Sequence, residues 1–185
     1  MNAGRDIDDA LLLLRARDGD AQAFTDFVLR WQDRLRAHAR RLTGHQAAAD
    51  DVLQETWVAV LKGLGRLSDV EAYRTWIYRI LSRKAADWVR GRQKRRRLDR
   101  RVARDAIVFS DQAGRSERIE SLDDAVKCLS PPLRSAVLLH YVEEFSVEEV
   151  ARILTIPRGT VKSRLHNARR QLRALIEEQD HAETK

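Results

Sequence analysis

The sequence predicts an all-α protein made of two small helical domains that a flexible linker joins. Glycine and proline are scarce, with 8 and 3 among 185 residues, which is about half of their usual share. Between the glycines of the first half, apolar side chains recur every three or four residues, the period of a helix that buries one face. A helix-turn-helix pattern follows in the last third of the chain. Together these observations favour helices throughout the folded parts.

Glycines divide the first half into four predicted helices, because a glycine inside a helix costs about 1 kcal/mol and tends to mark a helix end. The positions are Gly19, Gly44, Gly63 with Gly65, and Gly91. Four such helices fit one small bundle, for which we expect residues 1–91. A polar, arginine-rich stretch without apolar periodicity predicts a linker over residues 92–120. Its arginine cluster at residues 95–101 either extends the preceding helix and tracks phosphates or is a disordered polycation. We expect the second domain at residues 121–178 and a polar tail at 179–185.

The second domain contains a predicted helix, a tight turn and a further helix. Ser146 precedes the first of these helices and Glu149 stands three residues later, the arrangement of a capping box. The apolar positions of this helix stop at Thr155, before Pro157, and a new series begins at Val161. Thr155 stands where many such turns have glycine, so we expect modest backbone strain there. A helix-turn-helix of this kind presents the polar face of its second helix to the DNA major groove.

Positive charge is concentrated in two segments. The net charge is +7, yet residues 90–104 hold nine basic residues against one acid, and residues 158–173 hold six basic residues and no acid. The remainder of the chain is therefore acidic. Two separate basic stripes favour a polyanion gripped at two places, because lysine and arginine contacts to phosphates dominate nucleic-acid affinity. The alternatives are solvated helix faces and, for the helix-turn-helix, a structural hairpin that binds no DNA.

Composition also disfavours several classes of protein. No apolar run approaches the ~18 residues of a membrane span, and no cationic-then-apolar leader opens the sequence, so we expect a cytoplasmic protein. The single Cys128 excludes an internal disulfide and a cysteine-based zinc site. The histidines show no spacing that pairs two of them on one metal, and no glycine-flanked nucleophile or phosphate-cradling loop appears. We therefore expect neither an enzyme nor a cofactor.

Three ordered segments carry a more specific pattern: DDVLQETWVAVLKGL at residues 50–64, YRTWIYRILSRKAADWVR at 73–90 and SVEEVARILTIPRGTVKSRLHNARRQL at 146–172. Together they resemble bacterial RNA polymerase sigma factors of the extracytoplasmic-function (ECF) group. The resemblance implies sigma domain 2 and sigma domain 4, joined by a flexible linker. In this family domain 2 recognises and melts the minus-ten promoter element and domain 4 reads the minus-thirty-five element, and neither catalyses a covalent reaction.

Acidic and polar side chains line one side of the predicted helix after Gly44. Asp51, Gln54, Glu55 and Val58 follow one another at i, i+3, i+4 and i+7, which places them on one face. The resemblance implies that these residues dock on the coiled coil of the polymerase β′ subunit, and an ordinary solvated face is the alternative. It further implies a contact with the polymerase β flap and a cognate anti-sigma factor that holds such proteins inactive.

The next predicted helix combines aromatic and cationic side chains along one side. Stacking on an exposed base contributes ~1–3 kcal/mol, while guanidinium groups hold the backbone of an opened strand. The resemblance adds the loop before this helix, which captures one minus-ten base in the family. The predicted minus-ten contacts are Ser68, Asp69, Trp76, Arg79, Arg83, Asp87 and Arg90. For Trp76, a place in the core is the alternative.

The second helix of the helix-turn-helix supplies the predicted minus-thirty-five contacts. They are Arg158, Thr160, Lys162, Ser163, Arg164, His166 and Arg169. We therefore expect an alternative sigma factor that binds core polymerase and directs promoter-specific initiation. One alternative is a stand-alone helix-turn-helix regulator, which binds its operator tightly without polymerase and ordinarily as a dimer. Another is a sigma-factor mimic that sequesters an anti-sigma regulator and never touches DNA.

Overall fold

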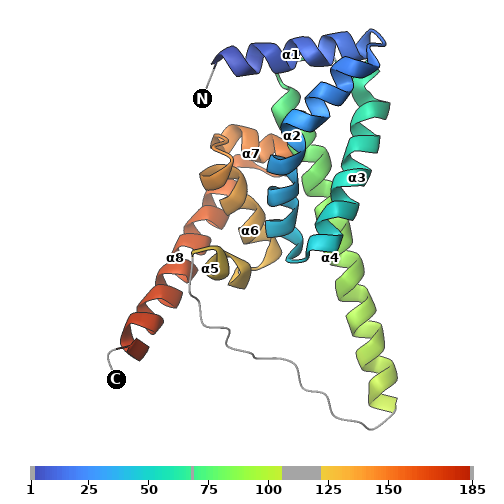
Figure 1. Ribbon diagram of the computed structural model, residues 1–185. Helices are drawn as coiled ribbons and strands as arrows, with labels where there is room; N and C mark the ends of the chain where they lie inside the picture. Colours follow the sequence, from blue (N-terminus) through green and yellow to red (C-terminus); the bar gives the residue numbers. More distant parts are fainter. Residues whose placement is uncertain (1–2, 68, 106–121, 184–185) are drawn as a thin grey trace.

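Four helices form an N-terminal bundle in the computed structural model (Figure 1). The structure describes residues 3–67, 69–105 and 122–183. The bundle consists of α1 (Ala3–Arg17), α2 (Ala21–Thr43), α3 (Gln46–Gly63) and α4 (Tyr73–Asp105), with a short 3₁₀ turn, η1 (Leu64–Arg66), after α3. Helix α1 lies across one end of the bundle, and α4 extends beyond the opposite end of α3. The predicted helical bundle is confirmed.

Aromatic side chains form the centre of the bundle. Phe27 and Trp31 of α2 stack with ring centroids 6.0 Å apart, and Tyr73 of α4 meets them edge-on at 5.8 and 5.7 Å. Trp57 of α3 meets Phe27 edge-on at 6.2 Å. Edge-to-face pairs contribute about 0.5–1.5 kcal/mol beyond the area that they bury. These rings fix the positions of α2, α3 and α4 relative to one another.

Helix α2 begins and ends at the residues that its sequence predicts. The Asp20 carboxylate accepts a hydrogen bond from the Ala23 N–H, which satisfies one of the unpaired donors at the helix start. Gly44 ends the helix in the left-handed conformation, with φ of 75°, and its N–H donates to the Arg40 carbonyl over 2.8 Å. Glycine adopts this conformation at little cost because it has no Cβ.

Helix α4 does not end at Gly91, so the use of this glycine as a helix end is wrong, and the alternative in which the arginine cluster extends the helix holds. The helix continues to Asp105, so residues 92–105 of the predicted linker are helical. One interior glycine costs only about 1 kcal/mol, and the arginines, lysine and leucine that follow are good helix formers. A Cβ at Gly91 would meet no atom within 4 Å, so no close packing requires a glycine there. Residues 106–120 of the predicted linker lie outside the described residues.

A second helical unit follows in the C-terminal part of the chain. It contains α5 (Leu122–Cys128), α6 (Pro131–Val137), η2 (Leu138–Val142), α7 (Val147–Leu154) and α8 (Arg158–Glu183). The element η2 is a π-helical continuation of α6. Helix α8 extends to Glu183, through most of the predicted tail, and Cys128 is exposed at the end of α5.

The predicted helix-turn-helix is present as α7, a tight turn and α8. The Ser146 hydroxyl accepts a hydrogen bond from the Glu149 N–H over 3.2 Å, and the Glu149 carboxylate accepts one from the Ser146 N–H over 2.9 Å. This confirms the capping box. Thr155 has a φ of 55°, so the left-handed residue expected at the turn is a threonine. The turn thus carries the modest strain that its sequence predicts.

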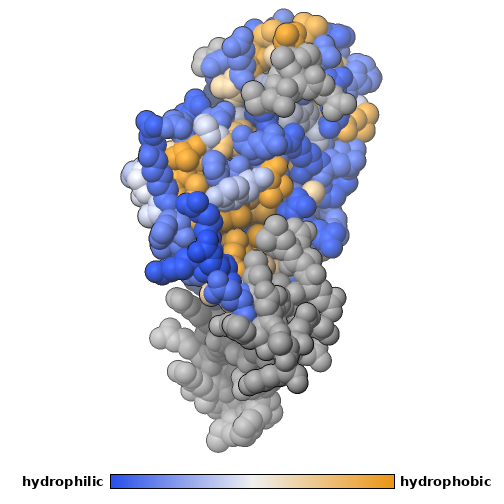
Figure 2. All heavy atoms as spheres, turned by 90° about the vertical axis from the view of Figure 1, so that its left-hand side faces the viewer, coloured by the Kyte–Doolittle hydropathy of each residue, from blue (hydrophilic) through white to orange (hydrophobic). Residues whose placement is uncertain are grey.

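The two units lie against each other, mainly through α4 and α7 and also through α2 and α6. Figure 2 shows the side on which the C-terminal unit lies: hydrophilic side chains surround apolar ones that gather in the middle of this face. Within the described ranges, no helix is both long enough and apolar enough to span a bilayer. The same residues contain no group of three His, Cys, Asp or Glu side chains placed to hold a metal ion.

Candidate protein and nucleic-acid interfaces

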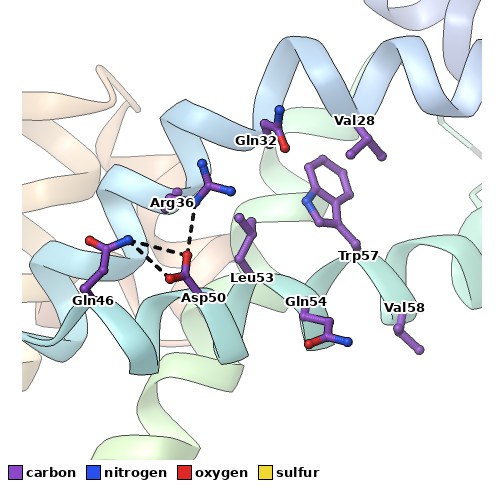
Figure 3. Close-up of a pocket in the computed structure, with 9 residues that line it drawn as sticks. All are labelled: Val28, Gln32, Arg36, Gln46, Asp50, Leu53, Gln54, Trp57 and Val58. Atoms are coloured by element: carbon purple, nitrogen blue, oxygen red, sulfur yellow. Dashed lines mark hydrogen bonds and ion pairs between the residues drawn. The ribbon is translucent and has the colours of Figure 1, made fainter.

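A groove of about 630 Å³ runs between α2 and α3 (Figure 3). The Trp57 indole lies between the two helices, with Val28 of α2 and Val58 of α3 on either side of it. At the other end, Asp50 accepts hydrogen bonds from Arg36 of α2 over 3.1 Å and from Gln46 over 3.3 Å. The groove therefore offers an apolar end and a charged end along one side of α3.

The predicted acidic stripe on α3 is exposed and lies along this groove. Gln54 and Val58 line the groove, and the Val58 side chain is 47% exposed. Asp51 and Glu55 are exposed beside it, and the Glu55 carboxylate accepts a 2.8 Å hydrogen bond from Lys84 of α4.

One groove residue, Asp50, was missed by the sequence analysis. It precedes Gln54 by four residues and Val58 by eight, so the helical spacing that selected those two also contains it. Leu61, three residues after Val58, is also exposed, although it does not line the groove.

The predicted minus-ten contacts occupy the start and the exposed side of α4. Ser68 lies outside the described residues. Asp69 already has partners, because its carboxylate accepts hydrogen bonds from the N–H groups of Glu71 at 3.0 Å and Ala72 at 3.4 Å, just before α4. Trp76 is half-buried, and a Cβ added at Gly63 would come within 2.9 Å of its ring. The indole thus packs on the end of α3.

The charged members of this set point to solvent. Arg83 is exposed, and Asp87 and Arg90 form an exposed ion pair one turn apart. Arg79 is exposed as well, but its Nε–H donates a 3.1 Å hydrogen bond to the Arg152 carbonyl at the end of α7. These residues share one helix, and Arg79 is held by the other unit of the protein.

The predicted minus-thirty-five contacts surround the first three turns of α8. Lys162, His166 and Arg169 are exposed and follow one another along one side. Arg158 is exposed and pairs with Glu148 of α7, and the Ser163 hydroxyl donates to the Thr160 carbonyl over 3.0 Å. Thr160 and Arg164 are half-buried. The exposed cations at a helix N-terminus form a surface that suits phosphates.

Comparison with known proteins identifies the family. The family description "Sigma-70 region 2" matches residues 27–95, and "Sigma-70, region 4" matches residues 119–172. The ECF RNA polymerase sigma factor SigW of Bacillus subtilis is 28% identical over 171 residues, which cover 86% of this chain and 91% of SigW. The RNA polymerase sigma factor CarQ of Myxococcus xanthus is 30% identical over 168 residues, which cover 89% and 95% of the two chains. This chain belongs to the ECF sigma factors.

Two solved structures share the fold. CnrH, in complex with the cytosolic domain of CnrY, matches with a TM-score of 0.68 and 26% identity, over 92% of this chain and 98% of CnrH. RpoE of Bartonella quintana, in complex with the anti-sigma factor NepR, matches with a TM-score of 0.64 and 25% identity, over 85% and 98%. Both matches span the bundle and the C-terminal unit together.

As an ECF sigma factor, this protein is a non-enzymatic initiation factor that binds core RNA polymerase and promoter DNA. Region 2 covers most of the bundle, and region 4 covers the C-terminal unit up to the middle of α8. The predicted family, fold class and function are confirmed. The alternative of a stand-alone helix-turn-helix regulator leaves the match to region 2, which covers the larger part of the bundle, unexplained.

A buried cluster joins the two regions of this sigma factor, and the sequence analysis missed it. Glu143 follows η2, and its side chain is only 3% exposed. Its carboxylate accepts hydrogen bonds from Arg34 and His38 of α2 over 2.8 and 3.0 Å, and from the Tyr78 hydroxyl of α4 over 2.5 Å. We call these four residues the Glu143 junction. No local sequence pattern predicts this cluster, because its members come from α2, from α4 and from the residue after η2.

The Glu143 junction holds its carboxyl group in the charged form. Burial alone favours the neutral acid, but the hydrogen bonds from His38, Tyr78 and Arg34 outweigh it and lower the pKa of Glu143 to about 2. Burial and the adjacent carboxylate raise the pKa of the Tyr78 hydroxyl far above its ordinary value, so this group remains a donor. The cluster is therefore an ionised carboxylate whose charge is balanced by donors of the other unit.

Proposed function

We propose that this sigma factor docks on core polymerase with the groove between α2 and α3 and with the acidic edge of α3. The observation that carries this assignment is the separation of charge. Asp50, Asp51 and Glu55 lie on α3, whereas the exposed cations of the described residues are prominent on α4 and α8. An acidic edge repels DNA but suits a basic protein surface, and the β′ coiled coil is the expected partner.

The apolar end of the groove supports the same assignment. Val58 is exposed beside Trp57, Leu61 is exposed one turn farther along α3, and protein interfaces commonly bury aromatic and aliphatic anchors within a charged rim. The charged end at Asp50 and Arg36 then sets the orientation of the partner, since charge complementarity fixes register more than it adds affinity.

The test is a double charge reversal, Asp51→Lys with Glu55→Lys. We expect core-polymerase affinity to fall at least tenfold in a titration of labelled protein, because two attractive contacts become repulsive. The control is Asp8→Lys with Glu177→Lys, which changes net charge equally at exposed positions on α1 and α8. Unchanged affinity in the α3 variant, or an equal loss in the control, contradicts the assignment.

We infer that α4 and α8 hold the promoter at two places, with α4 on the minus-ten element and α8 on the minus-thirty-five element. Lys162 supports the second contact because it is exposed on the helix that follows the tight turn. We expect Lys162→Ala to weaken promoter binding by the holoenzyme and to reduce the slope of log K against log salt by about one. Lys62→Ala on α3 is the control, and an unchanged slope for Lys162→Ala contradicts the placement.

We further infer a cognate anti-sigma factor. RpoE of Bartonella quintana was solved with the anti-sigma factor NepR, and that chain resembles this one over almost its whole length. Core polymerase operates in the cytoplasm, so the sigma factor acts there. We expect loss of such a regulator to raise transcription from the promoters that this protein reads, and a screen that finds no such gene contradicts the inference.

A further inference from the structure

Apolar side chains anchor the connection between η1 and α4 to the bundle. Leu64, in η1, is only 3% exposed, and the half-buried Leu67 and Val70 pack against the core. The Tyr73 N–H donates to the Val70 carbonyl over 3.1 Å, which joins this connection to the first turn of α4. At its described positions the connection therefore has a defined shape before any DNA arrives.

Gly63, at the end of α3, permits a close approach of the Trp76 indole from α4. Its φ of −92° is accessible to residues that have a side chain, so the backbone conformation does not require a glycine. A Cβ at this position, however, would lie 2.9 Å from Cζ2 of Trp76. Two carbon atoms attract each other at about 3.5–4.0 Å and repel each other at shorter distances. The missing side chain of Gly63 thus makes room for the indole.

Gly65 lies two residues later and has no such neighbour. A Cβ there would meet no atom within 4 Å, and the residue is exposed. A change from glycine to alanine therefore displaces the indole when it is made at Gly63 and leaves the packing intact when it is made at Gly65. The two glycines form a matched pair for an experiment.

The indole of Trp76 is placed to support the start of α4. It packs against the core of the bundle, and it precedes the exposed Arg79 and Arg83 by three and seven residues, on the same side of the helix. A ring that stacks on an unpaired base has to offer a free face to it. The packing of this indole against the end of α3 instead fixes where α4 starts, and with it the adjoining connection.

Asp69 anchors the other end of the same segment. Its Oδ1 accepts hydrogen bonds from the N–H groups of both Glu71 and Ala72, as the side chain of an N-terminal capping residue does. This oxygen is therefore occupied, and a carboxylate repels the phosphates of a nearby strand. Asp69 is suited to shaping the chain before α4 rather than to contacting DNA.

We propose that Gly63, Trp76 and Asp69 are positioning residues, which hold the connection before α4 in the shape that receives the unpaired minus-ten base. Trp76 and Asp69 then act through this shape and not by touching the base. A binding segment that is ordered in advance loses less conformational entropy when its ligand binds. The inference deepens the proposed contact between α4 and the minus-ten element and rests on it.

The test measures how strongly the holoenzyme depends on one base of the unpaired strand. Its ligands are the single-stranded minus-ten sequence of a promoter that this holoenzyme transcribes and a series of the same strand with one abasic site at each position. For the unchanged protein we expect one position at which loss of the base weakens binding about fivefold or more, the lower end of what stacking on one base contributes. That position marks the captured base.

The first comparison is between the two glycines. Gly63→Ala should reduce the base dependence to about twofold or less, because the displaced indole shifts the connection, while binding of the abasic strand changes little. Gly65→Ala should retain the full dependence, and both variants should bind core polymerase as the unchanged protein does. The proposal is overturned if Gly63→Ala retains the full dependence, if Gly65→Ala loses it equally, or if Gly63→Ala lowers core binding instead.

A second change tests whether Gly63 acts through the indole. Trp76→Phe removes Cζ2 and Cη2, the ring atoms nearest to the added Cβ. We expect the double variant to recover most of the base dependence that Gly63→Ala loses. A direct stack of Trp76 on the base, or a general loss of structure, predicts no recovery, and that result overturns the proposal.

Asp69 provides an independent comparison should Gly63→Ala fail to fold. Asp69→Asn keeps an oxygen that accepts the two N–H bonds, whereas Asp69→Ala removes it. We expect the first variant to retain the base dependence and the second to reduce it. Equal base dependence in the two variants overturns the proposal.

The unchanged holoenzyme separates this inference from the proposed function. If it binds the strand without dependence on any base, the proposed contact of α4 with the minus-ten element fails, and the inference fails with it. If one base is captured but Gly63→Ala and Asp69→Ala both keep the full dependence, only the positioning roles are overturned.

Discussion

Two buried carboxylates, Asp9 and Glu143, enter the space between α2 and α4 in the same way. Asp9 of α1 accepts hydrogen bonds from Arg30 and the Trp31 indole of α2, both over 2.9 Å, and from the Tyr73 hydroxyl of α4 over 3.0 Å. Glu143 also accepts from an arginine and a ring nitrogen of α2 and from a tyrosine of α4. The two receptors are built from the same side-chain types on the same pair of helices.

The difference lies in what each carboxylate joins. Asp9 lies 22 residues from Trp31 and 64 from Tyr73, and all three belong to one bundle. Glu143 lies 65 residues from Tyr78 and belongs to the other region. Buried apolar residues of the two units belong to one continuous cluster, so the Glu143 contact lies beside a shared apolar core. The same chemistry therefore stabilises a fold in one place and an arrangement of two folded units in the other.

The largest effect is expected from removing the first carboxylate. Asp9→Ala removes the acceptor of the buried Trp31 indole N–H, one acceptor of the Tyr73 hydroxyl and the ion-pair partner of Arg30. We expect the free energy of unfolding of the bundle to fall by about 4 kcal/mol. Urea denaturation monitored by tryptophan fluorescence measures it. A loss below about 1 kcal/mol would show that the cluster does not have the structural role assigned to it.

Acidification should weaken the Glu143 contact, with an effect somewhat smaller than that of Asp9→Ala. The pKa of Glu143 is about 2 when docked, against the ordinary 4.5, so its stabilisation of the contact between the two regions is complete above pH 4.5 and is lost as the pH falls through about 2. This difference corresponds to at most about 3 kcal/mol. We expect the distance between spin labels on Cys128 and on a cysteine from Lys62→Cys to lengthen across this range in the protein with Glu143. Glu143→Gln should lack the transition. An identical transition in both proteins contradicts the assignment.

The smallest effect is expected from the capping box, which lies in the C-terminal unit close to the junction but does not form part of it. Ser146→Ala removes the acceptor for the Glu149 N–H and should destabilise α7 by about 1 kcal/mol. Hydrogen exchange of the α7 amides measures this change. The distance between the two regions should remain as short as in the unchanged protein. A longer distance in this variant would show that the stability of α7, rather than the carboxylate contact, holds the two regions together.

Most features that depend on neighbouring residues can be predicted from the sequence. The Gly44 helix end, the capping box at Ser146 and the left-handed Thr155 are local, and each is present. The helix end predicted at Gly91 is absent, because the cost of one glycine is smaller than the gain from continuing a helix of favourable residues. The residues assigned to polymerase and promoter remain predictions, although the structure places Gln54 and Val58 along a groove.

Helical periodicity and charge, read along the chain, determined that this protein has two helical units, an acidic edge on α3 and basic faces on α4 and α8. Tertiary structure alone decided that Asp9 and Glu143 are buried and that α7 lies on α4. The physical reason is that a helix repeats every 3.6 residues, so residues close together in the sequence are enough to predict which side chains share a face. A buried carboxylate depends on donors that distant segments bring to it, and no spacing within one segment encodes them.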